Sequence, residues 1–462
     1  MIAILKDTSI YAIGDVLTKG IGFFAIIFYT HFITQSDMGV YGYIMVIVSF
    51  ATTFFILGAD NAYARYFFEY KDEHKRKVLT TTLFLFLFLW MLVVLIVPII
   101  FAKELSYIFL DTYDYSLAFL FALASLPLKL LASMSNQALR NQFKTKQFVI
   151  YNFITAVVTV TSAIYLLKFT DLGVASIFLG VIIGDIFVLP LRFFAIKELF
   201  IKEVDFTILK SILAYGVPFL PASVAYWVFS SADRVMLESM SSLESVGIYT
   251  VAVSPGAIMS LVASAIGQAW SPHAVKAYEE DKEKAKILYV RFLKVLIAVA
   301  LFLVFCASML GQEIISLIFP PEYMAVFYPM MLLLIGIGFQ ITVQVTATGI
   351  SLAKKTVYFI YITLFVAFIN IALNYILIPI YAEVGASFAT MISYLLLTLI
   401  YSIVSQKLFR LDYDFRYLLI AFGLLGVAFF ASFMDVIIRI ILFAIVLGVL
   451  YAKKEKIIER IR

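Results

Sequence analysis

The sequence predicts an all-α polytopic membrane protein with about fourteen transmembrane helices, and its composition, its apolar spans and its charge distribution all indicate this class. Of the 462 residues, 63% are hydrophobic and 14% are charged, and the mean hydropathy is +1.02. Ordinary soluble domains have roughly 45–50% apolar and about 25% charged residues. A span needs roughly 20 residues to cross ~30 Å of hydrocarbon. No separate soluble or catalytic domain therefore fits in the chain.

The apolar spans follow one another with short connections between them. They lie at residues 9–33, 39–64, 78–101, 115–138, 147–167, 174–191, 211–236, 247–270, 295–311, 326–352, 357–378, 385–405, 417–432 and 436–452. The first, second and seventh are the least apolar, so a count of twelve or thirteen stays open. The single Cys306 lies inside a span, so no intramolecular disulfide can form.

The distribution of Lys and Arg predicts the orientation, because cationic loops stay on the cytoplasmic side. With the N-terminus inside, 28 of the 35 Lys and Arg residues fall in cytoplasmic segments, Arg192 among them. The opposite loops hold only Lys103 and Lys168. Both termini are therefore expected in the cytoplasm. The net charge of +5 reflects this topology and does not indicate nucleic-acid binding.

An internal repeat relates the two halves of the chain at a shift of about 205 residues, as in many secondary transporters. Similar short sequences open equivalent spans, at 9–14 and 211–216, 39–41 and 247–249, and 173–176 and 385–387. Six spans per copy make the repeat parallel. We expect an N-lobe at 1–205, a C-lobe at 206–410, and two further helices with a cytoplasmic tail at 411–462. A cavity between two such lobes, opened alternately to each side by rocking, would serve transport.

Ionisable residues inside the spans are candidate site residues, because each costs about 2.5–3.5 kcal/mol at membrane depth. Asp15 and Lys19 share one helical face in the first span. Polar stripes at helical spacing run along the fourth and seventh spans, and neutral polar pairs follow in later spans. The fourth span carries Lys129, Ser133, Asn136 and Arg140, the seventh Ser223, Tyr226, Ser230 and Arg234, and the later spans Ser260, Ser264, Gln268, Gln340, Gln344, Asn370 and Asn374.

The functional interpretation is a hydrated cavity in which cations attract a phosphate or diphosphate. Its cations would be Lys19, Lys129, Arg234 and Arg65, and its neutral lining would be Ser230, Gln268, Gln340, Gln344, Asn370 and Asn374. A structural interpretation stands beside it. Asp15 can neutralise Lys19, Arg65 can anchor at the interface or pair with Asp60, Asp233 and Arg234 can form an interlobe salt bridge, and the Ser stripes can be packing surfaces. Arg439 and Asp435 are treated as interfacial.

Asp185, which lies mid-span in the sixth span, is a candidate proton or sodium site, or else a partner of Lys129. Pro218 and Pro221 follow Gly216 inside the seventh span, where they remove backbone donors and predict a bend.

Several classes of protein are disfavoured by the sequence. There is no Gly-Lys dipeptide, so there is no P-loop for ATP. His31, His74 and His273 are dispersed without metal-ligand spacing. No cofactor is expected. The first outer loop is only about 34–37, which disfavours a membrane glycosyltransferase or polymerase.

Motifs across the second half carry a resemblance to a known family. They are Gly216-Val217-Pro218 with Asp233-Arg234 and Val246-Gly247-Ile248-Tyr249, then Phe319 with Glu322-Tyr323, and Asn370 and Asn374 through Ile378-Pro379 to Gly385-Ala386-Ser387. With these the chain resembles the multidrug/oligosaccharidyl-lipid/polysaccharide exporter superfamily, and within it the Wzx-type O-antigen and capsule-repeat flippases.

The resemblance implies two six-helix lobes around a cationic cavity, and transfer of an undecaprenyl-diphosphate oligosaccharide from the cytoplasmic to the outer leaflet of a bacterial inner membrane. It also implies a monomer that works with a polysaccharide polymerase and a chain-length regulator. Related lipid II flippases place arginines in the first, second and seventh to eighth spans. Here the matching regions offer Lys19, Arg65 and Arg234, with Lys in place of Arg in the first span.

Alternative functions stay open. Asp15 and Asp185 would suit a proton- or sodium-coupled drug exporter of the same superfamily, which expects an anionic cavity. A lipid II flippase and a glycan polymerase or ligase are further alternatives.

Overall fold

The structure, a computed structural model, describes residues 2–353, 355, 357–411, 423, 427, 429–430, 433–434 and 437–441. Within these ranges the side chains of 2–9, 11–13, 97–98, 222, 261–269, 271–272 and 275 lie outside the description. All regular elements of the described chain are helices, which confirms the all-α class. The helices separate into two compact units, unit 1 at Met1–Glu238 and unit 2 at Ser239–Arg462.

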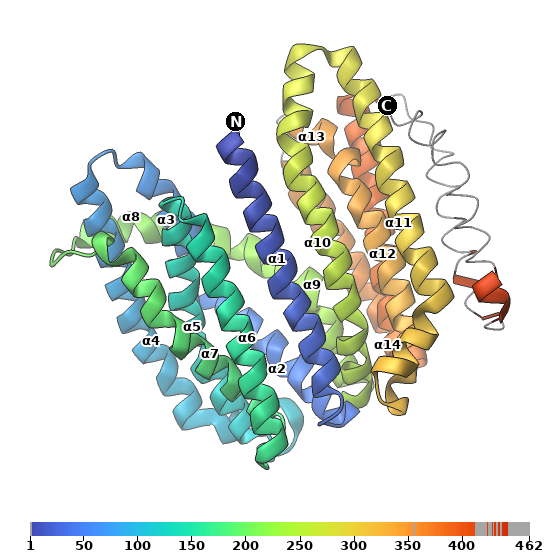
Figure 1. Ribbon diagram of the computed structural model, residues 1–462, viewed down its shortest axis with the longest axis horizontal. Helices are drawn as coiled ribbons and strands as arrows, with labels where there is room; N and C mark the ends of the chain where they lie inside the picture. Colours follow the sequence, from blue (N-terminus) through green and yellow to red (C-terminus); the bar gives the residue numbers. More distant parts are fainter. Residues whose placement is uncertain are drawn as a thin grey trace. The chain divides into compact units, whose positions relative to one another are not determined.

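Unit 1 contains long helices joined by short turns (Figure 1). They are α1 (Ile2–Tyr29), α2 (Gln35–Phe55), α3 (Ala59–Glu69), α4 (Glu73–Leu110), α5 (Ser116–Asn141), α6 (Thr145–Phe169), α7 (Ala175–Ile196), the 3₁₀ turn η1 (Lys197–Leu199), α8 (Phe206–Gly216), the 3₁₀ turn η2 (Val217–Phe219) and α9 (Leu220–Met240). In unit 2 the elements are α10 (Leu243–Glu280), α11 (Lys282–Ile318), the 3₁₀ turn η3 (Pro321–Val326), α12 (Phe327–Thr346), α13 (Thr348–Leu352) and α14 (Val357–Leu408).

Side-chain caps fix where several helices begin. The Thr34 hydroxyl accepts from the Asp37 backbone N–H at 3.1 Å, and the Asp37 carboxylate accepts in return from the Thr34 N–H at 3.4 Å. Asp205 and Asp281 cap α8 and α11 by accepting backbone N–H groups of the first turn. Such caps satisfy N–H groups of the first turn that have no partner inside the helix. Each helix therefore begins where a polar connection meets the apolar span.

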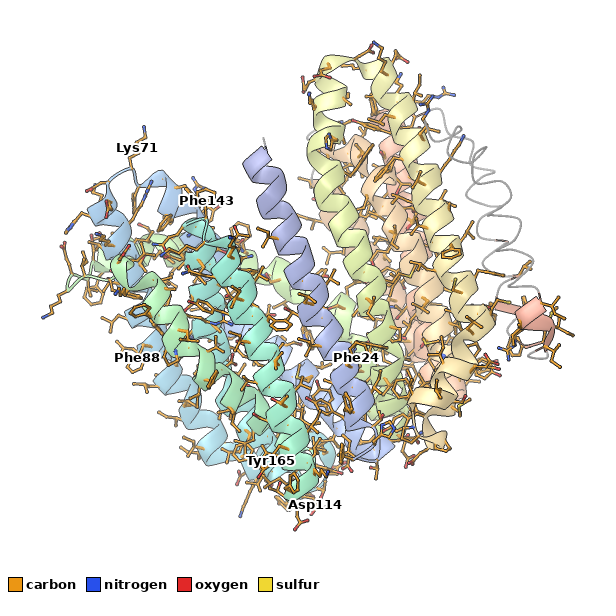
Figure 2. All side chains as sticks on the ribbon, in the orientation of Figure 1. Phe24, Lys71, Phe88, Asp114, Phe143 and Tyr165 are labelled. Carbon is orange, nitrogen blue, oxygen red and sulfur yellow. The ribbon has the colours of Figure 1, made fainter. Side chains whose placement is uncertain are left out.

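The helices have the length and surface of membrane spans. By length and hydropathy, eight helical segments of the described chain could cross a membrane, or nine if α8 and α9, bent by 46°, form one span. Large apolar side chains face outward, as at Phe24 and Phe88, which are 59% and 52% exposed. Figure 2 shows Lys71 at one end of unit 1 and Asp114 at the other. Consecutive loops therefore lie at opposite ends, as a polytopic protein requires.

Helix α5 is the packing centre of unit 1. It contacts α2, α3, α4, α6 and α7, and its Leu130 and Met134 are fully buried in a cluster with Tyr63 and Leu83. A fully buried side chain of this size contributes about 1.5–3 kcal/mol relative to an aqueous reference. In unit 2, α12 has the corresponding place, with most of its residues buried against α10, α11 and α14.

Helix α14 is a hairpin of two spans, because its backbone breaks at Ala382 with φ 47° and ψ −126°. Hydrogen bonds join the two halves, from Asn370 Nδ2 to Ser393 Oγ at 3.0 Å and between the hydroxyls of Thr363 and Tyr401 at 2.8 Å. The halves coincide with the expected spans 357–378 and 385–405.

The helices follow the predicted spans from the first to the twelfth, while 417–432 and 436–452 lie almost wholly outside the described residues. The total of fourteen therefore stays a prediction. The boundary between compact units falls after Glu238, not at the expected repeat boundary of 205 and 206. The reason is that α8 packs against α3 and α4 of unit 1. The division into 1–205, 206–410 and 411–462 stays a prediction about the repeat.

Candidate functional site

Two broken helices of unit 1 meet at their breaks. The chain leaves α2 through Leu57 and Gly58, whose φ angles are 54° and 64°, and the other break runs from Gly216 through the 3₁₀ turn η2. A Cβ on Gly58 would lie 2.2 Å from the Gly216 carbonyl oxygen, and a Cβ on Gly216 would lie 2.5 Å from that of Leu57. Both positions need glycine because backbone packs directly on backbone there.

The predicted bend at Pro218 and Pro221 is confirmed, since α8 and α9 form a helix pair bent by 46°. Non-helical backbone at membrane depth is tolerated where it is buried in protein or lines a hydrated cavity. The two breaks therefore direct attention to the space beside them.

A crevice of about 600 Å³ with both polar and apolar lining lies along α2, the α2–α3 break and α9. Its polar lining comes from one face of each helix, namely Ser49, Thr52, Thr53, Asp60, Asn61, Ser223, Ser230 and Ser231, and its aromatic lining is Phe219, Tyr226 and Trp227. The predicted stripe of Ser223, Tyr226 and Ser230 thus faces a cavity. Helical spacing places these side chains on one face, and the break brings the start of α3 to the same wall.

Trp227 ties the two walls of this crevice together. Its indole Nε1–H donates to the Ser49 hydroxyl at 2.9 Å and to the Val46 carbonyl at 3.3 Å, and its ring lies 4.7 Å from that of Phe50 between centroids. These contacts hold an aromatic face at a fixed position beside hydroxyl groups.

The crevice carries little charge. Among its described lining residues, Asp60 is the one ionisable acid, its carboxylate accepting from the Asn61 amide at 3.4 Å, and no Lys or Arg takes part. Hydroxyl, amide and carboxylate groups beside aromatic rings suit a neutral polyhydroxylated ligand or a cation better than a phosphate.

The predicted cavity cations lie apart from this lining. Arg65 is exposed on α3, pairs with Glu69 at 3.4 Å and places its guanidinium carbon 4.6 Å from the Tyr215 ring centroid. Arg234 interacts electrostatically with the Tyr41 hydroxyl of α2. Lys19 is exposed on α1. These three remain candidates for binding a diphosphate: Lys19 and Arg65 are exposed, and Arg234 is half-buried.

The predicted acids have separate surroundings. Asp15 is half-buried on α1. Among the described residues it forms no ion pair with Lys19. Asp233 is 8% exposed and accepts from the Arg234 backbone N–H at 2.8 Å. Asp185 is buried on α7. Its carboxylate interacts electrostatically with Lys129 of α5 and, less strongly, with Arg192 of its own helix. The pairing of Asp185 with Lys129 was one of the two interpretations left open.

Arg192 is the residue that the sequence interpretation placed wrongly, in a cytoplasmic segment. It is 2% exposed. Its guanidinium donates to Asn136 Oδ1 at 2.6 Å, to Asn152 Oδ1 at 3.0 Å and to Thr155 Oγ1 at 3.0 Å. It thereby joins α5, α6 and α7. Helical spacing in the sequence could have indicated this buried position, because Asp185 and Arg192 are seven residues apart and therefore lie on one face of the helix.

The predicted polar residues of unit 2 divide into two groups. Asn370 and Asn374 are buried within α14, where Asn374 Nδ2 donates to Asn370 Oδ1 at 3.1 Å. Gln340 is half-buried and Gln344 is exposed on α12. The side chain of Gln268 lies outside the described residues.

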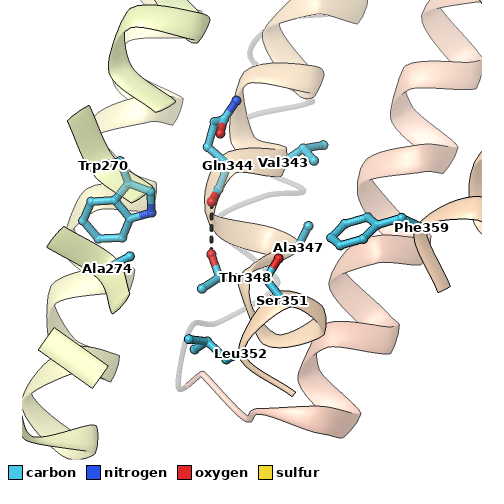
Figure 3. A pocket seen from close by; sticks show the side chains of 9 residues that line it. All are labelled: Trp270, Ala274, Val343, Gln344, Ala347, Thr348, Ser351, Leu352 and Phe359. Atoms are coloured by element: carbon cyan, nitrogen blue, oxygen red, sulfur yellow. Dashed lines mark hydrogen bonds between the residues drawn. The ribbon is translucent and has the colours of Figure 1, made fainter. Parts of the chain in front are cut away.

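A smaller pocket of about 240 Å³ lies within unit 2, between α10, the end of α12, α13 and the start of α14 (Figure 3). Gln344 lines it, together with Trp270, Thr348, Ser351 and Phe359. Trp270 had not been singled out from the sequence, since a lone aromatic residue in an apolar span carries no periodic signal.

Arg439 is buried within the protein, at 3% exposure, and its expected position at the membrane interface stays a prediction. Its guanidinium forms a two-pronged ion pair with Glu313 of α11, with Nη2 to Oε1 at 2.6 Å and Nη1 to Oε2 at 3.2 Å. This pair fixes part of the chain beyond α14 to α11.

Comparison with known proteins gives a consistent family and fold. The family profile described as polysaccharide biosynthesis protein matches residues 4–277. The capsular polysaccharide biosynthesis protein CapF of Staphylococcus aureus is 24% identical over 205 residues, which are 43% of this chain and 51% of that protein. The chain thus matches about half the length of that relative.

Among solved structures, the lipid II flippase MurJ in an inward closed conformation matches with a TM-score of 0.73 at 18% identity, covering 97% of this chain and 99% of that one. An inward-facing multidrug resistance MATE family transporter of the MOP superfamily matches with a TM-score of 0.60 at 15% identity, covering 87% and 94%. These likenesses show the fold. With the family match, they confirm the resemblance to the exporter superfamily that the motifs indicated.

Proposed function

Because the chain belongs to the polysaccharide biosynthesis protein family, we propose that it is a flippase that moves an undecaprenyl-diphosphate oligosaccharide, the repeat unit of an O-antigen, capsule or exopolysaccharide, from the cytoplasmic to the outer leaflet. The observation that carries the proposal is the crevice beside the two broken helices of unit 1. Its hydroxyl and aromatic lining fits sugars, which offer both hydroxyl groups and apolar ring faces.

The cargo has a second, anionic part, and the cations of unit 1 suit it. Arg65 and Arg234 lie on α3 and α9, the helices that also supply the crevice, and a guanidinium can bind two phosphate oxygens at once. Lys19 adds a flexible point charge on α1. We assign these residues to the diphosphate and the crevice to the glycan.

The backbone crossing at Gly58 and Gly216 supplies a place where unit 1 can bend during alternating access. Asp185 with Lys129 is the candidate pair for coupling to H⁺ or Na⁺, because a buried carboxylate beside a cation changes its charge only with a change in its surroundings.

The protein would lie in the inner membrane of a bacterium with the end that carries Lys71 in the cytoplasm, following the retention of cationic loops. It would act as a monomer and hand its cargo to a polymerase with its chain-length regulator.

The test is flipping by purified protein in liposomes that contain a polyprenyl-diphosphate disaccharide, read as protection of the sugar from an external glycosidase. Thr52→Val, Ser230→Ala and Asp60→Asn should each slow flipping several-fold because each removes a polar group from the crevice. Thr161→Val is the matched control. Thr52 and Thr161 both donate to the carbonyl four residues earlier, at 2.7 and 2.8 Å, but Thr161 is exposed on α6 away from the crevice. Equal rates for all four variants would contradict the assignment.

A cation-coupled drug exporter is the second candidate, favoured by Asp60 as the charged group of the crevice. It predicts uptake of a cationic dye that is lost in Asp60→Asn. In the same liposomes a lipid-linked pentapeptide disaccharide would test a lipid II flippase. Transport of the dye without flipping of either lipid would reject the glycan proposal.

A further inference from the structure

The described lining of the small pocket of unit 2 includes none of the residues that the proposed function uses. It is bounded by α10, α12, α13 and α14, near the end of the unit that carries Lys282 and Lys355. None of the described residues that line it carries a charge. A volume of about 240 Å³ lies below the ~300–1,000 Å³ of pockets for drug-sized ligands, so it suits a single ring.

Trp270 forms one wall and is held rigidly. Its ring stacks on Phe292 with centroids 3.9 Å apart and meets the edge of Tyr289 at 5.3 Å. The Tyr289 hydroxyl in turn donates to the carbonyl of Ala274, which also lines the pocket. The indole therefore has little freedom to turn away.

The indole N–H of Trp270 is buried and has no hydrogen-bond partner in the described chain. Figure 3 shows the nitrogen on the edge of the ring that faces Gln344 and Thr348. An unpaired buried donor is costly, and nearly all such groups are satisfied by protein, water or a ligand. Surrounding atoms cover the Trp270 nitrogen, so this residue contributes aromatic ring surface to the pocket and no accessible donor.

The opposite wall supplies adaptable polar groups beside an aromatic ring. The Thr348 hydroxyl donates to the Gln344 backbone carbonyl at 3.0 Å. The lone pairs of the Thr348 hydroxyl oxygen therefore remain free to accept a hydrogen bond. The side chains of Gln344 and Ser351 have no hydrogen-bond partner among the described residues, and Phe359 adds an aromatic ring to the lining. An amide, two hydroxyls and aromatic ring surfaces are the groups that bind a neutral sugar ring.

We infer that this pocket is a second, separate sugar-binding site, which holds one neutral sugar ring against the aromatic rings of Trp270 and Phe359, with the sugar hydroxyls bonded to Gln344, Thr348 and Ser351. The inference rests on the proposed function for its source of sugar, and its position near the Lys-rich end of unit 2 makes it the place where the glycan is first bound on the cytoplasmic side. A hydroxylated lipid headgroup has the same chemistry, so the experiment separates the two sources.

The chain has three tryptophans, Trp90, Trp227 and Trp270, and two of them lie in different pockets. In Trp90→Phe/Trp227→Phe protein, Trp270 is the sole reporter of the unit 2 pocket. In Trp90→Phe/Trp270→Phe protein, Trp227 is the sole reporter of the crevice. Each is placed in phosphatidylcholine nanodiscs and titrated with chitobiose and with lactose, and its melting curve is compared with the parent to establish folding.

We expect a saturable change of Trp270 emission. Gln344→Leu should raise the apparent Kd about three- to tenfold, which is the effect of one lost hydrogen bond. Gln340→Leu, one turn away on α12 and outside the pocket lining, should leave it unchanged. No saturable change at Trp270, or an equal response in Gln344→Leu, overturns the inference. An emission change that phosphatidylglycerol discs produce without sugar also overturns it in favour of a lipid headgroup.

Response at Trp227 alone would reject the second site and leave the proposed function standing. Response at Trp270 alone would keep the second site and remove the glycan from the crevice. The two failures are therefore distinguishable.

Discussion

The crossing of the two broken helices allows a test in which steric overlap and backbone strain are separated. Gly58 has φ +64° and would place a Cβ 2.2 Å from the Gly216 oxygen, so Gly58→Ala combines both effects. Gly216 has an ordinary φ of −76° but would place a Cβ 2.5 Å from the Leu57 oxygen, so Gly216→Ala has overlap alone. Gly173 has φ +53° with no atom within 4 Å of a Cβ, so Gly173→Ala has strain alone.

The magnitudes follow from these contacts. Left-handed backbone at a non-glycine residue costs about 1–2 kcal/mol. Forced overlap in a packed interior costs about 1–3 kcal/mol. Because the overlapping atoms at the crossing belong to backbone, the upper part of that range applies. We expect losses of about 1 kcal/mol for Gly173→Ala, about 2–3 for Gly216→Ala and about 3–5 for Gly58→Ala. For a unit of 238 residues, 1 kcal/mol corresponds to roughly 2–4 °C in Tm.

The assay is thermal unfolding of purified protein in one detergent, with flipping measured in parallel. Gly20→Ala and Gly22→Ala on α1, where a Cβ meets nothing within 4 Å, are the controls and should be neutral or slightly stabilising. If Gly58→Ala costs no more than Gly173→Ala, the two breaks do not pack backbone on backbone, and the reasoning about this crossing is wrong.

Three further predictions concern charged residues. Arg439→Met should lower the free energy of unfolding by about 2–3 kcal/mol, which is less than for a fully buried ion pair because Glu313 is partly exposed. Glu313→Gln should lower it by a smaller amount. Melting curves that rank the two variants in the opposite order would contradict the pairing. Arg192→Met should cost about 2–3 kcal/mol because three half-buried side-chain acceptors lose the guanidinium as a donor, and an unchanged Tm would refute that network. Hydrogen bonds from the side chain and backbone of Thr207 lower the pKa of Asp205. Its stabilising effect is therefore present above the pKa of the unfolded chain and is lost as pH falls through the lowered value. Asp205→Asn, which can still cap α8, should make Tm less sensitive to acid, and an identical pH profile would argue against this role.

Much of the fold could be predicted from the sequence, because the bilayer imposes a length and an apolarity on each span that one helix satisfies by itself. The helix starts at Thr34 and Asp205 follow from local capping, which also needs no distant partner. The stripe of Ser223, Tyr226 and Ser230 could be read from helical spacing, and it does line the crevice.

The sequence by itself therefore determined the class of protein, the positions of the described spans and the face of α9 that meets the crevice, since these depend on interactions within one helix or with the bilayer. Tertiary structure decided which helices supply the other walls and which charges are paired. Arg192 reads as a loop cation in the sequence, yet it is buried because Asn136 and Asn152 of two other helices accept its hydrogen bonds. Gly58 gives no signal in the sequence, and Gly216 marks only a bend, until the two breaks are brought together. Contacts of this kind join residues forty or more positions apart, and no local pattern specifies them.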